Sequence, residues 1–460
     1  MRILFVAHLF VPKHRAGVEL YTAELARTLA ARGHDIAVFH AEKEISRPHG
    51  TLLREDFEGH RRFRLINDLT FRSFEETYRW PAAERRFREA LEEHRPEVVH
   101  FHHLLFLSSR LPELARRSGA RVVMTLHDFW LACPRFGQML EKGRRVCAGP
   151  EPDRCANCLA DFKLAQTRAE RLGISAIGQL RRWTGIDLSS RLEGRRKKAV
   201  RIASPAEVDD GATGRPDELA VITPEDIARR TASIAGDLRH VDVVLSPSKT
   251  VADVIESAGL VGQVAISRYG LDASRLGDER PERPRSPMRF VFIGTLAEHK
   301  GIHVLVDAFN RLPDLPLTVY GSDRYYPDYV AQCRAAVTSP SIDFAGELER
   351  SELVKALAEA DALIVPSVWL ENSPFTIQEA FLAGLPVLAS DLGGMAELVA
   401  HETSGLLFEP GSGESLAEQA KRLANDPALY RKLQQGIPPI KSIEEDAIEL
   451  EAWYSDAVKR

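Results

Sequence analysis

The chain has 460 residues, a formal net charge of −5 and 44% hydrophobic residues, and its length predicts two or three domains of about 100–200 residues each. Because the net charge is small and the sequence shows no basic and aromatic recognition motif, we expect no nucleic-acid partner. The sequence opens on a core strand, and no segment approaches the roughly 18 apolar residues that span a bilayer, so we expect a cytoplasmic protein. Five cysteines in so long a chain do not form a disulfide framework.

The N-terminal half alternates predicted strands and helices, which is typical of a parallel sheet covered by helices on both faces. We expect strands near 2–7, 35–40, 97–101, 121–126 and 241–246, and helices near 17–32, 82–94 and 109–118. Gly17 lies at a turn from strand to helix, where the missing side chain would let a ligand approach the backbone. His127 ends a strand in Thr-Leu-His-Asp, and the carboxyl ends of parallel strands line the clefts of such folds.

An insert is predicted at about 134–235, and four of the five cysteines cluster at its start. They follow a C-x13-C-x7-C-x2-C pattern made by Cys133, Cys147, Cys155 and Cys158. The C-x2-C unit is typical of one half of a tetrahedral thiolate site, and a reducing compartment favours structural zinc over disulfides. We therefore expect these four residues to hold zinc, with reduced thiols, a disulfide or an iron–sulfur group as the alternatives.

A basic segment follows the cysteines. Residues 161–202 carry eleven Lys or Arg against four Asp or Glu, including the run 195–198. This composition suits peripheral contact with a membrane surface or with an anionic acceptor, although a solvated helix face explains it equally well. Residues 203–222, rich in Pro, Gly and acidic side chains, predict a flexible loop.

A second parallel sheet is predicted after the charged, proline-rich stretch 278–287, which has the composition of an exposed domain boundary. Its strands are expected from residue 290 and near 316–320, 341–344, 362–365, 386–389 and 406–408. The first strand ends in a glycine turn at Gly294, and Lys300 stands just before the predicted helix 302–312. This position suits a phosphate-binding lysine.

Two carboxylates, Glu371 and Glu379, flank a second predicted helix start. A carboxylate next to a diphosphate is unfavourable because like charges repel, so its presence there indicates another role. For Glu371 we expect that role to be accepting hydrogen bonds from sugar hydroxyls. Glu379 lies inside the helix, where it could reach ribose hydroxyls. This pair predicts a nucleotide-sugar site, whereas an ordinary amphipathic helix with two solvated glutamates is the alternative.

The residues between these glutamates favour anion binding at the helix start. Asn372 and Ser373 are good N-cap residues, and Pro374 suits the first helical position. The free N–H groups of Phe375 and Thr376, at the positive end of the helix, would then face a phosphate.

These motifs together resemble the retaining GT-B glycosyltransferases of family four. In the C-terminal half the resemblance lies in Gly294 to Gly301, Glu371 to Glu379 and the loop Asp391-Leu-Gly-Gly394; in the N-terminal half it lies in Gly17-Val-Glu19 and Thr125-Leu-His-Asp128. The resemblance implies an α/β GT-B fold with two Rossmann-like domains that face each other across a cleft. It places an N-terminal acceptor-side domain at 1–280, a nucleotide-sugar donor domain at 288–438, and a helix at 441–458 that crosses back to the first domain.

The resemblance also implies roles for individual residues. His127 would contact the donor sugar and phosphate near the reacting carbon, and Lys300 would stabilise the leaving diphosphate. The chain departs from the family pattern at Thr295, where an arginine is usual, and at Ala16-Gly17, where two glycines are usual. The sequence contains no Asp-x-Asp motif, so we expect no catalytic metal.

The function that we expect is therefore retaining transfer of a sugar from a nucleotide-diphosphate donor to a glycan or lipid-linked acceptor. Surface polysaccharide or glycoconjugate synthesis, at the inner face of the membrane, would use such an activity. An epimerase or a phosphorylase with the same fold is an alternative, and so is a non-catalytic scaffold that binds nucleotide-sugars. An epimerase would act without an acceptor, a phosphorylase would require phosphate or a lysine-bound pyridoxal cofactor, and a scaffold would bind the donor without hydrolysing it.

Overall fold

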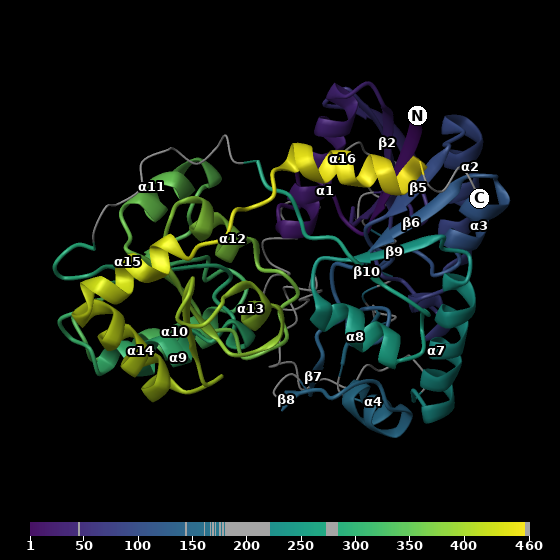
Figure 1. Ribbon diagram of the computed structural model, residues 1–460. Helices are drawn as coiled ribbons and strands as arrows, with labels where there is room; N and C mark the ends of the chain where they lie inside the picture. The colour runs from purple at the N-terminus through teal and green to yellow at the C-terminus, as the bar shows by residue number, and fades with distance from the viewer. Residues whose placement is uncertain are drawn as a thin grey trace.

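The computed structural model describes residues 1–44, 47–142, 145–160, scattered positions between 162 and 179, 221–272 and 284–455. Most of the predicted basic segment 161–202, most of the loop 203–222 and more than half of the boundary 278–287 lie outside the described residues. The described chain forms two α/β bodies that stand side by side (Figure 1).

The first body is built on an eight-stranded sheet with the order β10-β9-β6-β5-β1-β2-β4-β3. Its strands are β1 (Arg2–Ala7), β2 (Asp35–Glu42), β3 (Leu52–Phe57), β4 (His60–Ile66), β5 (Val98–Phe101), β6 (Arg121–Thr125), β9 (Val243–Ser246) and β10 (Ala265–Ile266). Neighbouring strands run parallel, except that β3 runs antiparallel to β4. The sheet is accompanied by η1 (Glu75–Thr77), α1 (Gly17–Ala31), α2 (Pro81–His94), α3 (Leu111–Arg117), α7 (Pro224–Leu238) and α8 (Lys249–Ser257).

The predicted strands and helices of this half are confirmed to within a few residues, but the edge hairpin β3–β4 was not predicted. Its strands read LLREDF and HRRFRLI, and charged residues occupy many of their positions. Ion pairs across the hairpin, such as Arg64 with Glu55 at 2.7 Å, account for these charges. The hairpin therefore lacks the continuous apolar run by which the central parallel strands are recognised.

The start of the insert forms a small unit of its own. It contains the two-stranded sheet β7 (Leu140–Glu141) and β8 (Arg145–Val146), followed by α4 (Pro152–Leu159). The helix α4 packs against α7, which belongs to the far end of the insert. Its residues Cys155 and Leu159 are buried in the main hydrophobic core of the first body.

The second body is built on a six-stranded parallel sheet with the order β13-β12-β11-β14-β15-β16. Its strands are β11 (Phe290–Ile293), β12 (Leu317–Tyr320), β13 (Ile342–Gly346), β14 (Ala362–Val365), β15 (Val387–Ser390) and β16 (Gly405–Phe408). Its helices are η3 (Glu298–Lys300), α9 (Ile302–Asn310), α10 (Pro327–Ala335), η4 (Arg350–Glu352), α11 (Leu353–Ala358), α12 (Phe375–Leu382), α13 (Gly393–Leu398), α14 (Gly413–Asn425) and α15 (Pro427–Gln435). The two bodies are Rossmann-like halves, so the predicted fold class is confirmed.

The last described helix, α16 (Ile443–Ser455), leaves the second body and packs on α1 of the first (Figure 1). The buried carboxylate of Asp446 fixes this contact: it accepts hydrogen bonds from Tyr21 Oη at 2.8 Å, from the Gly270 backbone N–H at 2.8 Å and from Lys441 Nζ at 2.7 Å. Further along the helix, Tyr454 Oη lies 2.7 Å from His100 Nδ1.

Within the described residues, no helix combines the length and the apolar character that a membrane span requires.

Asp446→Asn should lower the free energy of unfolding by about 1.5–3 kcal/mol, because hydrogen bonds to a buried charged group are lost or weakened and Lys441 loses one of its two carboxylate partners. Equilibrium denaturation followed by circular dichroism measures this change. Glu444→Gln, an exposed position in the same helical turn, is the matched control and should change stability by less than about 0.5 kcal/mol. Equal effects of the two substitutions would contradict the assigned role of Asp446.

Candidate active site

Two loops of the second body form the core of the candidate site. One loop follows β11 and ends at Gly301; the other follows β14 and leads into α12. They lie side by side because β11 and β14 are neighbours in the sheet. Gly301 has a φ of 75°, and a Cβ atom there would lie 2.0 Å from the Pro366 carbonyl oxygen, so only glycine fits this approach.

The two loops are joined by an ion pair between Lys300 and Glu371. Lys300 Nζ lies 2.6 Å from Glu371 Oε1, and Ser367 Oγ donates to the same oxygen at 2.7 Å. Burial raises the pKa of the Glu371 carboxyl, but the Lys300 ammonium, together with hydrogen bonding from Trp369 and Ser367, outweighs burial and holds this pKa below its ordinary value. Glu371 is therefore an ionised hydrogen-bond acceptor in a buried position.

The start of α12 differs from the prediction in two respects: Pro374 precedes the first helical residue, and neither Asn372 nor Ser373 caps the helix. The helix begins at Phe375 with Pro374 as its N-cap residue, and no side chain caps it within the described part of the chain. Ser373 Oγ instead accepts a hydrogen bond from Gln378 Nε2 at 3.2 Å. Thr376 is the second residue of the helix and is half-buried. The backbone N–H groups of the first turn thus have no side-chain acceptor.

Asn372 contacts the other body instead of capping the helix. Its Nδ2 donates to the Leu126 carbonyl oxygen at 3.1 Å, and its Oδ1 accepts a hydrogen bond from Ser248 Oγ at 2.6 Å. A second polar contact crosses the same gap nearby: the carboxylate of Glu397 accepts the backbone N–H groups of Lys249 at 2.7 Å and Thr250 at 2.6 Å. Glu397 thereby caps the N-terminus of α8 from the opposite body.

Phe375 occupies the space that the missing side chain of Gly17 leaves open. A Cβ atom on Gly17 would lie 2.6 Å from Phe375 Cδ2. The prediction reserved this space for a ligand, whereas the structure fills it with an aromatic ring from the second body. Glycine at position 17 is required here by a contact between the two bodies.

The Phe375 ring continues into an aromatic stack in the first body. It stacks on Tyr269 with a centroid separation of 4.9 Å, and Tyr269 stacks on His127 at 5.3 Å. Both ring nitrogens of His127 have neighbours: Nδ1 lies 2.6 Å from Tyr269 Oη, and Nε2 lies 3.1 Å from His102 Nδ1. Burial holds the pKa of His127 well below its ordinary value, so this imidazole is neutral at physiological pH.

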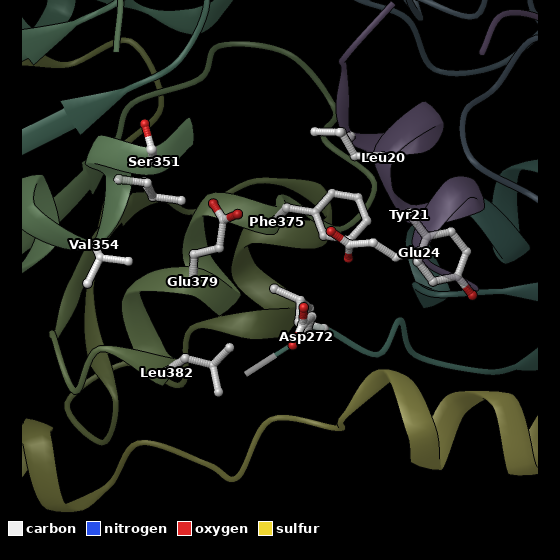
Figure 2. Close-up of a pocket in the computed structure, with 12 residues that line it drawn as sticks. Leu20, Tyr21, Glu24, Asp272, Ser351, Val354, Phe375, Glu379 and Leu382 are labelled. Carbon is white, nitrogen blue, oxygen red and sulfur yellow. The ribbon is translucent and has the colours of Figure 1, made fainter. Parts of the chain in front are cut away.

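A pocket of about 390 Å³ lies between the two bodies, next to this stack. Figure 2 shows Phe375 and Glu379, both from α12, at this pocket, with Leu20 and Glu24 of α1 on the other side of Phe375. The remaining lining is mostly apolar and consists of Gly17, Tyr21, Leu271, Asp272, Ser351, Leu353, Val354 and Leu382. Glu379 thus belongs to the pocket, while Thr295 lies half-buried in the loop after β11.

The four insert cysteines line one small cavity, as their clustering in the sequence predicted. Among the described residues, however, no three His, Cys, Asp or Glu side chains are placed to hold a metal ion. The predicted zinc site formed by Cys133, Cys147, Cys155 and Cys158 is therefore not supported.

The individual thiols have hydrogen-bond partners in the backbone. The cysteines are free thiols, and Cys147 Sγ donates to the Gly149 carbonyl oxygen at 3.2 Å. Cys158 Sγ accepts the backbone N–H of Lys142 at 3.1 Å. Burial raises the pKa of the Cys133 thiol to about 12, which keeps it protonated.

Sequence reasoning missed the residues that join the two bodies. Ser248, Tyr269 and Glu397 all take part in the contacts described above. Glu397 follows the predicted glycine loop at residues 393–394, which was a usable signal. Tyr269 and Ser248 carried no such signal, because their importance comes from partners that are distant in sequence.

Two family models match the chain, one for each half. The model "Glycosyl transferases group 1" matches residues 278–437, and the model "Glycosyltransferase Family 4" matches residues 15–148. The chain belongs to the GT-B glycosyltransferases of family four. The two matched segments contain the loops of Lys300 and Glu371 and the α1 start at Gly17, whereas Ser248 and Tyr269 lie between them.

Curated relatives agree with this family. A glycogen synthase of Mycobacterium tuberculosis is 30% identical over 203 residues, covering 42% of the chain and 48% of the relative. The amylovoran biosynthesis glycosyltransferase AmsK of Erwinia amylovora is 27% identical over 179 residues, covering 36% of the chain and 43% of the relative. The chain thus spans about half the length of the curated relatives it matches.

Solved structures share the fold of the whole chain. A sucrose-phosphate synthase from Thermosynechococcus elongatus superposes with a TM-score of 0.65 at 18% identity, covering 100% of this chain and 99% of the other. The Anabaena protein HepE, solved in complex with UDP and glucose, superposes with a TM-score of 0.60 at 15% identity, covering 99% and 100%. At these identities the likeness establishes the fold.

Gly17→Ala should lower the free energy of unfolding by about 1–3 kcal/mol, because the added methyl group meets the Phe375 ring. In a Phe375→Ala background the same substitution should cost close to nothing, since the ring is gone. A double-mutant cycle by chemical denaturation measures this coupling. Gly236→Ala in α7, where no atom lies within 4 Å of the new Cβ, is the control and should be neutral or stabilising. Additive effects at positions 17 and 375 would show that the ring does not occupy this space in solution.

Lys300→Met should lower the free energy of unfolding by about 2–4 kcal/mol at pH 7, because Glu371 then remains buried without its cation. The pKa of Glu371 lies below its ordinary value of 4.5, so the stabilisation by the pair is present above that pH and is lost as the pH falls through the lowered pKa. Denaturation curves from pH 3 to pH 8 should therefore converge at the acid end. Lys249→Met, which removes an exposed ion pair with Asp253, is the control and should have little effect. A constant gap between wild type and Lys300→Met at every pH would contradict the ion-pair assignment.

Proposed function

We propose that this protein is a retaining glycosyltransferase that moves a sugar from a nucleotide-diphosphate donor to a glycan or lipid-linked acceptor. The observation that carries the proposal is the ion pair between the half-buried Lys300 and the buried Glu371, beside the uncapped start of α12. This arrangement brings a cation, a helix N-terminus and an ionised acceptor into one small volume. A sugar diphosphate carries groups that complement these: phosphate anions for the cation and the helix N-terminus, and neighbouring hydroxyl groups for the acceptor.

Each part of the site would have a separate task toward the donor. Lys300 and the first N–H groups of α12 would face the diphosphate, where negative charge develops as the glycosyl–phosphate bond breaks. Glu371 would accept hydrogen bonds from sugar hydroxyls. Lys300 and the helix would supply positive charge here without a catalytic metal, and the sequence lacks an Asp-x-Asp motif.

The pocket between the bodies suits the nucleoside part of the donor. Its largely apolar lining would hold the base, and the carboxylate of Glu379 would accept hydrogen bonds from the ribose hydroxyls. The fold neighbour HepE was solved in complex with UDP and in complex with UDP-glucose, which supports a nucleotide-sugar as the ligand class.

The names of the curated relatives support a role in polysaccharide synthesis. They include a glycogen synthase, the amylovoran enzyme AmsK and the putative colanic acid glycosyltransferase WcaL of Escherichia coli. We place the acceptor among growing glycans or their lipid-linked precursors. His127 would position the donor sugar from the first body, as its place at the end of β6 allows.

A binding and transfer experiment tests the proposal. A thermal-shift panel of UDP-glucose, UDP-galactose, ADP-glucose and GDP-mannose should identify a donor, because a ligand at a hundred times its Kd stabilises the fold by about 2.7 kcal/mol. Transfer to glycan and lipid-linked acceptors is then followed by product analysis, with the anomeric configuration read by NMR. Retained configuration supports the proposal. Turnover without an acceptor would favour an epimerase, a phosphate requirement would favour a phosphorylase, and binding without turnover would favour a scaffold.

Glu379→Ala should weaken binding of the free nucleotide by about 10- to 100-fold, because hydrogen bonds between hydroxyls and a carboxylate are lost. Glu371→Ala should leave free-nucleotide affinity unchanged and remove the additional affinity that the sugar provides. Isothermal titration with the nucleotide and with its sugar conjugate separates the two effects. Equal losses for both ligands in both variants would overturn the role assignment.

A further inference from the structure

Trp369 lies in the loop between β14 and α12, at the junction of the two loops that hold Lys300 and Glu371. Its backbone neighbour Val368 donates a hydrogen bond to the His299 carbonyl oxygen at 2.9 Å, which fixes the loop against the Lys300 turn. This hydrogen bond joins the loop that carries Trp369 to the loop that carries Lys300.

The indole ring of Trp369 packs against neighbouring side chains, whereas its polar Nε1–H group does not take part in this packing. The ring packs against His299 at a centroid separation of 4.3 Å, and Lys300 Nζ lies 5.1 Å from its centroid. Burial lowers the pKa of His299 to about 3, so this neighbour is an uncharged ring, and the charges near the indole are those of Lys300 and Glu371. The Nε1–H group, in contrast, is buried and makes no hydrogen bond of regular geometry in the described structure, although it lies near enough to the Glu371 carboxylate to act as a weak donor that lowers the carboxyl pKa.

A buried N–H group without a well-formed hydrogen bond is costly, and here it lies beside a carboxylate that can accept further hydrogen bonds. Trp369 is close enough to Glu371 to help lower the pKa of that carboxyl. Among the described residues, the side-chain hydrogen bonds to Glu371 from Lys300 and Ser367 both end on Oε1. The Oε2 atom therefore retains capacity to accept a hydrogen bond from a ligand.

A hydroxyl group matches this pair of atoms, because it donates one hydrogen bond and accepts others. We propose that Trp369 is a specificity-determining residue for the donor sugar: its indole N–H donates to the same sugar hydroxyl that donates to Glu371 Oε2. This inference rests on the proposed function and names the chemistry by which that site selects its sugar. Trp369 lies outside the motif that runs from Glu371 to Glu379.

Recognition of one hydroxyl from both sides has a measurable consequence. A deoxy sugar at that position would deprive both Glu371 Oε2 and the indole N–H of the sugar hydroxyl, whereas a fluoro sugar would keep a weak acceptor for the N–H and lose the donor to Oε2. Sites built to hydrogen-bond a hydroxyl reject the analogue that lacks it, because their buried polar groups stay unpaired. Removal of the indole N–H should reduce that rejection at one sugar position and at no other.

The test uses the whole chain and the nucleotide-sugar that gives the largest thermal shift in the panel above. Trp369→Phe keeps an aromatic ring against His299 and Lys300 but removes the N–H group. It should lower kcat/KM for that donor by about tenfold, with Kd for the free nucleoside diphosphate unchanged. The penalty for the deoxy donor at one sugar position should shrink by the same factor. Trp453→Phe in α16 is the matched control and should leave all of these values unchanged.

The outcomes separate this inference from the proposed function. A wild-type protein that binds and uses a nucleotide-sugar, with Trp369→Phe unchanged for every deoxy analogue, overturns the Trp369 assignment alone. Equal loss of affinity for the free nucleoside diphosphate and for the nucleotide-sugar in Trp369→Phe assigns the residue a structural role and overturns the inference as well. A wild-type protein that binds no nucleotide-sugar of the panel overturns both proposals.

Discussion

The ion pair between Lys300 and Glu371 is the interaction on which the candidate site depends. A carboxylate in a buried position stays ionised only if a nearby cation offsets the loss of hydration, and Lys300 is that cation. The geometry is fixed by the fold, because β11 and β14 are adjacent and Gly301 allows their loops to touch at Pro366. The site therefore combines a helix start without a side-chain cap and a negatively charged acceptor, and the nearby Lys300 ammonium offsets the negative charge.

The same loop also joins the two bodies of the molecule. Asn372 follows Glu371 directly and binds Leu126 and Ser248, while Phe375 packs against Gly17 and stacks on Tyr269. A change in the relative position of the bodies would thus displace residues that are adjacent to the ion pair. Residues outside the second body, among them Tyr269 and His127, consequently share in shaping the site.

Two departures from expectation have a common physical origin. The helix α12 was expected to be capped by Asn372 or Ser373, and the insert cysteines were expected to share a zinc ion. In both cases a side chain whose type suits the expected role hydrogen-bonds to a different partner. Asn372 accepts a hydrogen bond from Ser248, and Cys147 donates one to the Gly149 carbonyl oxygen. Residue type limits which bonds a side chain can make, whereas packing decides which partner is present.

The sequence by itself determined the alternation of strands and helices, the two parallel sheets, and the placement of Lys300 and Glu371 at strand ends, because these features follow from local hydrophobic periodicity and glycine turns. It also brought the four insert cysteines together correctly, since they are close along the chain. Only the tertiary structure decided that Phe375 fills the space at Gly17, that Tyr269 holds His127, and that β3 and β4 pair through charged side chains. These contacts join residues that are distant in sequence or patterned by charge, and local periodicity carries no information about them.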